Sequence, residues 1–405
     1  MRPSVIQPFA ALRYAAGDIS KEICPPYDVI SPAEKEELLA ASGYNIVRVE
    51  FPENKPVGIK RAGKTFQSWR RDGVLIKDRR PSFYVYTQQF EISGRSRTRT
   101  GFFCALKLDP ERIYRHEHTS AKPVDYRLEL LKGVGANTSP IFCLFGDTQG
   151  RASDTLSAYM DKKSTKRLYQ FTDKDNIKHS LRAVTDPLAI FEIQKTFTGE
   201  KFVIADGHHR YRTSLLYAEM KNRQAAGRDR AARPAHGAGA TAGTICPHNY
   251  ILAFLCPAES PGLVILPTHR AVRPRTDVSS KIKRYFDLKE WDGKGKPQIV
   301  VYHTGSFRIM HLKKKYLDKF RRYLQVPAIV LHKLVFDEVR TEDIYFTKDY
   351  QDAVRKAEEV RGYAFLLEPV KTGDLFLYSL SGMIMPPKTT YFYPKVPAGL
   401  VVYQV

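Results

Sequence analysis

Cysteine is scarce in this 405-residue chain, and its five cysteines are far apart in the sequence: Cys24, Cys104, Cys143, Cys246 and Cys256. No two of them have the C-x-x-C spacing of a thiolate metal site, and an odd number cannot be fully paired. This pattern argues against a disulfide framework and against a thiolate-bound metal. It is typical of a protein that stays in the reducing cytoplasm.

Long apolar runs are also missing. No stretch approaches the roughly 20 consecutive apolar residues that span a bilayer. The N-terminal residues MRPSVIQPFAALRYAAGD lack the apolar segment of a signal peptide. We therefore expect a soluble, cytoplasmic protein without a membrane partner.

Charge is abundant and unbalanced, with 65 basic and 43 acidic residues and a net charge of +22. Such an excess favours anionic partners, which include nucleotides, nucleic acids and acidic metabolites. The excess of basic residues is greatest in two segments. Residues 60–80 contain eight basic and two acidic residues, and residues 313–322 contain six basic residues and one acidic residue. Solvated helix faces would explain these runs equally well.

The composition, with 43% hydrophobic and 12% aromatic residues, is that of a folded globular protein. The length favours two or three domains. We expect an α+β fold in three parts, comprising residues 1–150, residues 151–272 with an exposed, mobile Ala/Gly/Arg-rich insertion at 223–247, and residues 273–405.

Several local patterns predict individual elements. Residues rich in β-branched and aromatic side chains predict strands at 45–51, 82–92 and 101–108, the last two joined by the basic turn 94–100. Ser31, followed by Pro32 and by Glu34 at the third position after the cap, predicts the start of a helix.

The segment KFVIADGHHRYRTSLLY, residues 201–217, predicts a buried strand, a tight turn and a helix from Tyr211. The turn contains Asp206, Gly207, His208, His209 and Arg210. Glycine lets the backbone approach a ligand, and a helix N-terminus attracts anions. Arginine can pair bidentately with phosphate, and imidazoles can donate hydrogen bonds. The turn thus predicts a phosphate site, with a metal site or a structural polar cluster as alternatives.

Two proline-containing segments carry further candidate groups. In CPPYDVISP the stiff Pro-Pro turn would hold the Asp28 carboxylate in a fixed direction, either for chemistry or as a turn residue. In MPPKTTYFYPK the side chains of Lys388, Thr389 and Thr390 are suited to a phosphate, although the segment also reads as a loop entering a final strand.

A third candidate cluster precedes a predicted helix and contains His116, Glu117, His118, Asp125 and Arg127. It fits a satisfied polar network, a divalent cation site, or a site for substrate or a Mg²⁺-bound phosphate; we assign no metal ligands. Finally, LPTHR places Thr268, His269 and Arg270 at a strand end, as anion contacts or as structural residues.

The D-G-H-H-R segment resembles the phosphate motif of the ParB/sulfiredoxin superfamily, in which a strand leads into G-x-x-R at a helix start. Its form is most similar to that of the free serine kinases. His208 occupies the place of the catalytic cysteine of sulfiredoxins, so thiol redox chemistry is not expected. The resemblance implies a ParB/sulfiredoxin-like nucleotide-binding core with a large inserted α/β segment and a C-terminal α+β domain.

The same resemblance extends to two other motifs. The serine kinases carry a catalytic carboxylate at a position comparable with Asp28, which is one methylene shorter than their glutamate, and a P-K-T-T segment like that at Lys388. The whole chain also resembles a family of prokaryotic proteins of similar length and unassigned function, through CPPYDVIS, HEHT, VIADGHHRY, LPTHR and MPPKTTYFYPK.

The sequence therefore predicts a kinase that uses ATP or ADP with Mg²⁺ to phosphorylate a small hydroxylated metabolite, with free serine or a related amino acid as the candidate acceptor. Asp28 and His209 would be catalytic, Asp206 to Arg210 would bind the nucleotide, and the substrate or phosphate would contact Lys388, Thr389, Thr390, His116, Glu117 and Arg127. The alternative is a nucleotide-gated, ParB-like protein that binds nucleic acid without kinase activity. The sequence shows no helix-turn-helix pattern after the DGHHR helix to support it.

Overall fold

A computed structural model of the chain describes residues 4–119, 121–160, 165–231 and 246–405. The described chain forms two compact units rather than three consecutive parts. Unit 1 comprises residues 1–114, 119–263 and 394–405, and unit 2 comprises residues 115–118 and 264–393. The expected boundary at residue 150 falls inside unit 1, because strands on both sides of it belong to one sheet.

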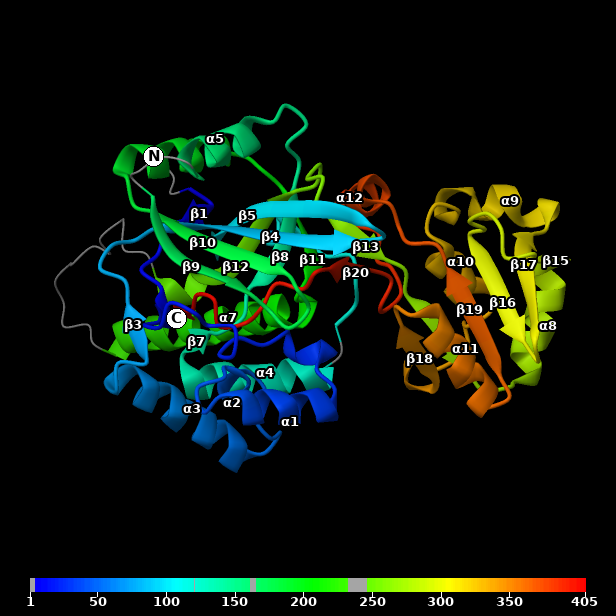
Figure 1. The fold of residues 1–405 in the computed structure, drawn as a ribbon, viewed down its shortest axis with the longest axis horizontal. Coiled ribbons are helices and arrows are strands. Elements are labelled where there is room, and N and C mark those ends of the chain that lie inside the picture. The colour runs from blue at the N-terminus through cyan, green and yellow to red at the C-terminus, as the bar shows by residue number, and fades with distance from the viewer. Residues whose placement is uncertain (1–3, 120, 161–164, 232–245) are drawn as a thin grey trace. The chain divides into compact units, whose positions relative to one another are not determined.

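Unit 1 contains a large mixed sheet with strands in the order β6-β11-β8-β12-β5-β4-β10-β9, and β1 pairs with β5 (Figure 1). The pairs β11–β6 and β12–β8 are parallel, and the other pairs are antiparallel. The α+β class is thereby confirmed. The strands of this sheet are β1 (Ile6–Gln7), β4 (Phe83–Ile92), β5 (Arg95–Lys107), β6 (Ile113–Tyr114), β8 (Ile141–Phe145), β9 (Lys166–Thr172), β10 (Lys178–Val184), β11 (Phe202–Asp206) and β12 (Tyr250–Pro257).

Helices and small strand pairs surround this sheet. The pairs are β2 (Leu12–Tyr14) with β3 (Leu75–Lys77) and β7 (Ala136–Asn137) with β21 (Tyr403–Gln404). The α-helices are α1 (Pro32–Ala41), α2 (Val47–Glu50), α3 (Pro56–Arg71), α4 (Ala121–Val134), α5 (Arg151–Met160), α6 (Pro187–Thr196) and α7 (His208–Ala231), and 3-10 turns occur at Tyr27–Val29 and Pro247–Asn249.

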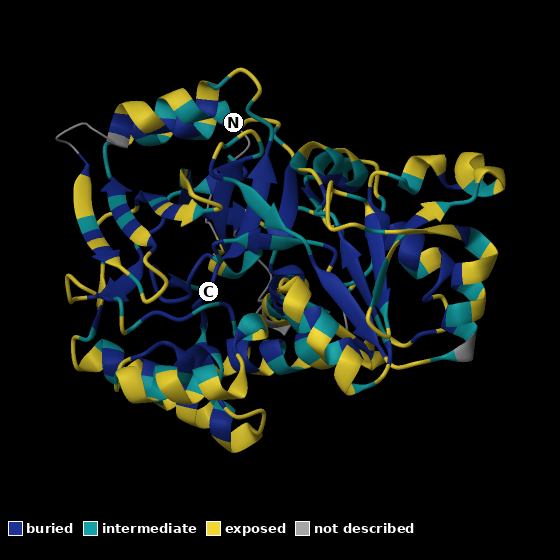
Figure 2. Cartoon of the chain, turned by 45° about the vertical axis from the view of Figure 1, so that its right-hand side comes forward, coloured by how far each residue is buried: buried dark blue, intermediate teal, exposed yellow. Residues whose placement is uncertain are grey.

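The core of unit 1 lies between the sheet and helices α5 and α6. Phe102 of β5 contacts Phe197 at the end of α6, with ring centroids 5.3 Å apart, and Ala152 and Leu156 of α5 join the same cluster of buried side chains. The central strands are almost continuously buried (Figure 2). Because both faces of these strands are covered, they have continuous apolar runs rather than an alternating pattern.

The β4–β5 hairpin is confirmed, but its turn is shorter than expected. Ser93 and Gly94 have φ angles of 50° and 70°, as in the two-residue turns that match strand twist. Residues 95–100, predicted as part of the turn, instead extend β5. The basic side chains of this segment therefore lie on a strand.

The strand predicted at residues 45–51 is wrong, because this segment contains helix α2. The Asn45 side chain explains the difference. It accepts a hydrogen bond from the Val47 amide at 2.9 Å, and its own amide group donates to the carbonyls of Lys21 and Ile23. This side-chain turn precedes Ile46, which is already in the α-helical conformation, and it overrides the β propensity of the valines. The predicted cap of α1 is confirmed, with Ser31 Oγ accepting from the Glu34 amide at 3.1 Å.

The first part of the insertion predicted at residues 223–247 is helical. Helix α7 continues through residue 231, and residues 232–245 lie outside the described residues. Within the described part of the chain, no helix has both the length and the apolar character that a membrane span requires.

Unit 2 is built on an antiparallel six-stranded sheet in the order β15-β17-β16-β19-β14-β18, and β13 and β20 form a separate antiparallel pair. Ala353 and Ala357 of α11 pack on one face against Val300 and Ala364. The strands are β13 (Val264–Leu266), β14 (His269–Val272), β15 (Phe286–Glu290), β16 (Ile299–His303), β17 (Ser306–Leu312), β18 (Ile344–Thr347), β19 (Tyr363–Leu367) and β20 (Tyr391–Tyr393), and the helices are α8 (Thr276–Tyr285), α9 (Lys314–Phe320), α10 (Pro327–Leu334), α11 (Tyr350–Glu359) and α12 (Thr372–Leu380).

Helices α3 and α4 of unit 1 approach each other closely at a pair of glycines. A Cβ atom added to Gly63 would collide with the carbonyl oxygen of Gly133, and one added to Gly133 would lie 2.9 Å from Ile59 Cγ2. Because no side chain separates the two helices here, their backbones meet.

Replacing Gly63 with alanine should therefore lower the free energy of unfolding by about 1–3 kcal/mol through overpacking, despite the better helix propensity of alanine. Urea denaturation followed by far-UV circular dichroism measures this change. The matched control is Gly43→Ala, where an added Cβ meets nothing within 4 Å. Equal stability of the two variants would contradict the proposed close contact.

Candidate functional site

The predicted strand, turn and helix at residues 201–217 are present in unit 1. Strand β11 ends at Asp206, Gly207 follows with a φ of 95°, and α7 begins at His208, three residues earlier than expected. The Tyr211 amide donates to the Gly207 carbonyl at 2.9 Å. His208, His209 and Arg210 thus form the first helical turn, where amides have no acceptor inside the helix.

Gly207 is required at this turn for two reasons. Its positive φ is unfavourable for other residues, and a Cβ atom would lie 3.1 Å from both Arg210 Nε and Ile141 Cγ2. The backbone consequently turns tightly between the end of β11 and the N-terminus of α7. This arrangement presents the positive end of a long helix beside the Asp206 carboxylate.

Two cations share the Asp206 carboxylate. Lys395 Nζ lies 3.3 Å from Asp206 Oδ2, and Arg210 Nη2 lies 3.6 Å from the same oxygen. All three side chains are at least 84% buried, with exposed fractions of 14%, 16% and 8% for Lys395, Asp206 and Arg210. Arg210 Nη1 also donates to the carbonyl of Pro140, which fixes the guanidinium beside the turn.

A third cation, Arg99 of β5, holds the chain next to Lys395. Its Nη2 donates to the Pro394 carbonyl at 2.6 Å and to the Gln88 side chain, and Gln88 Nε2 in turn donates to the Lys395 carbonyl at 3.0 Å. Arg99 is completely buried, with its guanidinium 5.0 Å from the centroid of the Phe142 ring. Burial lowers the pKa of Arg99, and no carboxylate among the described residues pairs with it.

Two buried cations thus lie beside one carboxylate oxygen at this turn. Arg210 also interacts electrostatically with the buried Glu50 carboxylate, so part of the positive charge is balanced. An anionic ligand would supply further oxygen acceptors for Lys395 and Arg210. Chemically, the cluster can accept a phosphate group or another small oxyanion.

Asp28 lies in the 3-10 turn Tyr27–Val29 and is exposed to solvent. The neighbouring Tyr27 interacts electrostatically both with Asp28 and with Arg210, which follows Gly207 in the turn. Burial raises the pKa of Tyr27 to about 12; Arg127 and Arg210 lower this pKa, whereas Asp28 raises it. The phenol of Tyr27 is thus within electrostatic range of Asp28 and of both arginines. Three segments that are far apart in the sequence meet there.

Arg127 of α4 makes a buried ion pair with Glu50 of α2, with Nη2 2.9 Å from Glu50 Oε1. Its Nη1 donates to the Glu50 carbonyl at 2.8 Å, and its guanidinium lies 4.7 Å from the centroid of the Tyr27 ring. Glu50 also accepts hydrogen bonds from Thr138 and Ser139. Since these contacts occupy Arg127, its predicted role in binding phosphate stays a prediction.

The other candidate residues belong to unit 2, where three sequence motifs come together. His116 Nε2 lies 3.3 Å from Thr390 Oγ1, and the His116 carbonyl accepts from the Met385 amide at 2.7 Å. Arg270 Nη2 donates to the Lys388 carbonyl at 3.2 Å. The HEHT, LPTHR and PKTT segments, which the sequence presents separately, thus form one structure.

Arg270 is the structural centre of this second cluster. It is 1% exposed, and burial lowers its pKa to about 9, opposed by Glu117. Its Nη1 also donates to the Thr268 carbonyl. Lys388 has a φ of 55°, and Thr389 Oγ1 donates to the Pro386 carbonyl at 2.6 Å. Arg270 therefore anchors the main chain that carries Lys388, which favours the structural reading of LPTHR.

The predicted polar cluster at residues 114–133 is divided between the units. His116, Glu117 and His118 belong to unit 2, whereas Asp125 and Arg127 belong to α4 of unit 1. The sequence reasoning also missed Lys395, Glu50, Arg99 and Gln88. Lys395 closes the MPPKTTYFYPK motif and could have been singled out there, but Glu50 was hidden by the wrong strand at 45–51.

The Glu50–Arg127 pair yields a stability prediction. Glu50→Gln leaves Arg127 buried without a carboxylate, and it should lower the free energy of unfolding by about 3 kcal/mol at pH 7. Burial raises the pKa of Glu50, but Arg127, Thr138, Arg210 and Ser139 outweigh burial and hold it below its usual 4.5. The stabilisation is therefore complete above pH 4.5 and is lost as the pH falls through the lower, folded-state pKa.

Urea denaturation of the wild type and of Glu50→Gln across pH 3–8 measures this difference. The two curves should converge below pH 4.5. A difference that stays constant down to pH 3 would show that Glu50 contributes packing and not charge. The double variant Glu50→Leu/Arg127→Met, which removes both charges, should recover part of the lost stability.

Solved structures show weak likeness to the chain. A free serine kinase variant in complex with AMP has a TM-score of 0.40 and 14% identity, covering 75% of this chain and 91% of its own. A conserved hypothetical protein from Pyrococcus furiosus has a TM-score of 0.36 and 14% identity, with coverages of 75% and 95%. SbnI from Staphylococcus aureus, truncated at its C-terminus, has a TM-score of 0.40 and 10% identity, with coverages of 75% and 87%.

Likeness at this level carries no functional argument. No curated protein matches the sequence. One protein family does match, over residues 6–334, and it is described as "Protein of unknown function (DUF1015)". The match covers most of the chain and confirms the expected membership of a family without an assigned activity. The chain belongs to the DUF1015 family.

Proposed function

We propose that the protein is a kinase that transfers phosphate from ATP or ADP to the hydroxyl of a small metabolite, with free serine or a related amino acid as the candidate acceptor. We further propose that unit 1 contains the ParB/sulfiredoxin-like, nucleotide-binding core. The proposal is supported above all by the two buried cations, Lys395 and Arg210, that lie beside Asp206 at the N-terminus of α7.

A polyphosphate would match this charge. Its oxygens can replace the Asp206 carboxylate as the partner of Lys395 and Arg210, while the first amides of α7 donate to the same group. His208 and His209 lie in this first turn and would add hydrogen bonds that do not require a permanent charge. This set of donors suits an anion that carries several negative charges.

Asp28 is the carboxylate that we assign to the acceptor hydroxyl. It would take the hydroxyl proton as the hydroxyl oxygen bonds to the terminal phosphorus, while the bond from phosphorus to the leaving phosphate oxygen breaks. Arg210, Lys395 and His209 would neutralise the charge that develops on the transferred group. Mg²⁺ would neutralise phosphate charge, and Asp206, released from its two cations, is the carboxylate of this cluster suited to hold it.

In unit 2, the loop containing Lys388, Thr389 and Thr390 is proposed to contact the substrate or the phosphorylated product. His116 hydrogen-bonds Thr390, and Arg270 holds the Lys388 carbonyl, so this loop has a defined conformation. Glu117 is assigned to the same substrate-binding surface of unit 2. The ammonium and hydroxyl groups of the loop are the chemical reason for this assignment.

The direct test is incubation of the purified protein with ATP or ADP, Mg²⁺ and a panel of hydroxy amino acids, followed by mass spectrometry of the products. We expect a phosphorylated amino acid whose formation depends on the nucleotide. Measurable nucleotide binding without any phosphorylated product would refute the kinase proposal while leaving the phosphate site intact.

Replacing Asp28 with asparagine removes the proposed base and should lower kcat by about 100-fold or more, with little change in nucleotide affinity. Asp28→Glu, which keeps the carboxylate, should retain much of the activity. Steady-state kinetics and calorimetric titration with ADP separate the two effects. A fall in ADP affinity equal to the fall in kcat would instead assign Asp28 to nucleotide binding.

Replacing Lys395 with glutamine removes one of the two cations that share Asp206. The dissociation constant for ADP should rise at least tenfold, since a charged hydrogen bond to phosphate is worth about 1.5–3 kcal/mol. Lys395→Arg, which keeps the charge, should have a smaller effect. If Lys395→Gln binds ADP as tightly as the wild type, the Asp206 cluster is not the phosphate site.

A further inference from the structure

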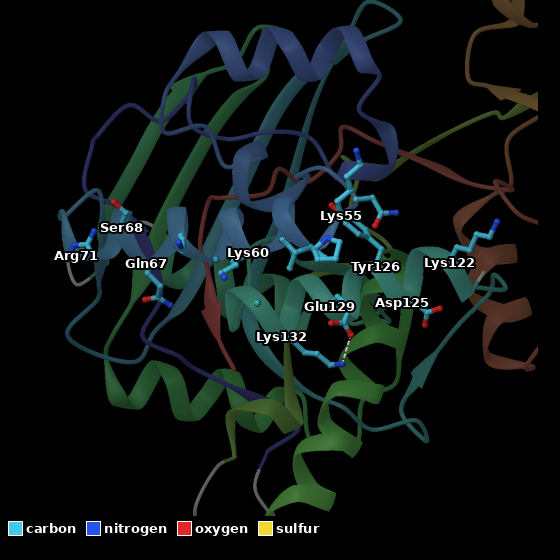
Figure 3. A pocket seen from close by; sticks show the side chains of 16 residues that line it. Lys55, Lys60, Gln67, Ser68, Arg71, Lys122, Asp125, Tyr126, Glu129 and Lys132 are labelled. Atoms are coloured by element: carbon cyan, nitrogen blue, oxygen red, sulfur yellow. Dashed lines mark hydrogen bonds and ion pairs between the residues drawn. The ribbon is translucent and has the colours of Figure 1, made fainter.

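A wide groove runs along the surface of unit 1 between helices α3 and α4, with a volume of about 1250 Å³ (Figure 3). None of the candidate site residues around Asp28 and Asp206 lines it. Its volume exceeds the range of about 300–1000 Å³ that is typical of small-molecule pockets. The groove therefore suits an extended ligand rather than a metabolite.

The groove owes its shape to the glycine pair described above. Gly63 and Gly133 both line it, and neither has a side chain to fill the space above the contact between the helices. Longer side chains rise on both sides. Figure 3 shows Lys60, Gln67 and Arg71 projecting from α3.

The lining carries six basic residues, Lys55, Lys60, Lys64, Arg71, Lys122 and Lys132, against the two acidic residues Asp125 and Glu129. Glu129 is already paired with Lys132 at 2.7 Å. Within the described residues, no carboxylate forms an ion pair with Lys55, Lys60, Lys64 or Lys122. The groove thus offers uncompensated positive charge at the surface, and an anionic polymer would complement it.

We propose that this groove binds the phosphodiester backbone of a single-stranded nucleic acid. Lys60, Lys64 and Arg71 follow one face of α3 over about 16 Å, at the rise of 1.5 Å per residue. They match a strand that runs along the groove. The neutral side chains of Asn54 and Gln67, which lie among the charges, are of the types that commonly contact phosphate and sugar.

Two features favour a nucleic acid over an acidic protein segment. Protein interfaces depend on buried aromatic and apolar anchors, whereas the only aromatic residue in this lining is Tyr126, whose hydroxyl donates to the Pro52 carbonyl. Phosphodiester binding needs only regularly spaced cations and polar donors.

Fluorescence anisotropy with a labelled 20-nucleotide oligo(dT) tests the proposal on the full-length protein. The double variant Lys60→Gln/Lys64→Gln should raise the dissociation constant at least tenfold at 100 mM salt. It should also reduce the slope of log K against log salt by about 1.4, at about 0.7 per phosphate contact on single strands. Both lysines are exposed, so the fold should be unaffected.

The matched control is Lys314→Gln/Lys315→Gln, which removes the same charge from exposed positions in unit 2. It should leave the affinity within twofold of the wild-type value. ADP titration of the groove variant should match the wild type, which separates this proposal from that of the phosphate site. Equal losses in both double variants, absence of DNA binding in the wild type, or tighter binding of a polyglutamate peptide than of oligo(dT) would overturn it.

Discussion

The pairing of two buried cations, Lys395 and Arg210, with the Asp206 carboxylate is the interaction on which the structure around this turn depends. Arg99, which is buried with no carboxylate partner among the described residues, holds the adjoining main chain at Pro394. Folding must supply the energy to hold these cations together. A protein maintains such an arrangement at a cost in stability, and an anionic ligand would offset that cost on binding.

Other elements of unit 1 fix the positions of the residues in this cluster. The sheet places the ends of β5, β8 and β11 near one another, and Gly207 allows α7 to begin directly beside Asp206. The C-terminal segment returns to the sheet, where Arg99 and Gln88 hold the carbonyls of Pro394 and Lys395. The buried Glu50–Arg127 pair connects α2 and α4 on the side of Tyr27.

Local patterns in the sequence predicted the local structure around the site. The cap at Ser31, the strand ending at Asp206 and the glycine turn all depend on neighbouring residues, so they can be read from the chain. The contacts of Lys395 with Asp206 and of Arg99 with Pro394 join residues 189 and 295 positions apart, and no local pattern encodes them. The strand expected at 45–51 is wrong for a related reason. The Asn45 side chain accepts from the Val47 amide and donates to the carbonyls of residues 21 and 23, and these contacts favour a helical turn.

The groove between α3 and α4 shows how one glycine pair can create a surface feature that composition alone does not reveal. The basic run at residues 60–80 has an ordinary explanation as a solvated helix face, but the contact between Gly63 and Gly133 opens a trough beneath those lysines. A binding function in this groove would be independent of phosphotransfer at Asp28. The two activities would belong to the same unit of the chain.

The central claim is that the cluster at Asp206 to Arg210 binds the phosphates of a nucleotide. Calorimetric titration of the wild-type protein with ADP and then with adenosine tests it most directly, because the two ligands differ only in the phosphates. The account predicts that ADP binds, that inorganic pyrophosphate competes with it, and that adenosine binds at least 100-fold more weakly. Equal affinity for ADP and adenosine, or no binding of ADP, would contradict it.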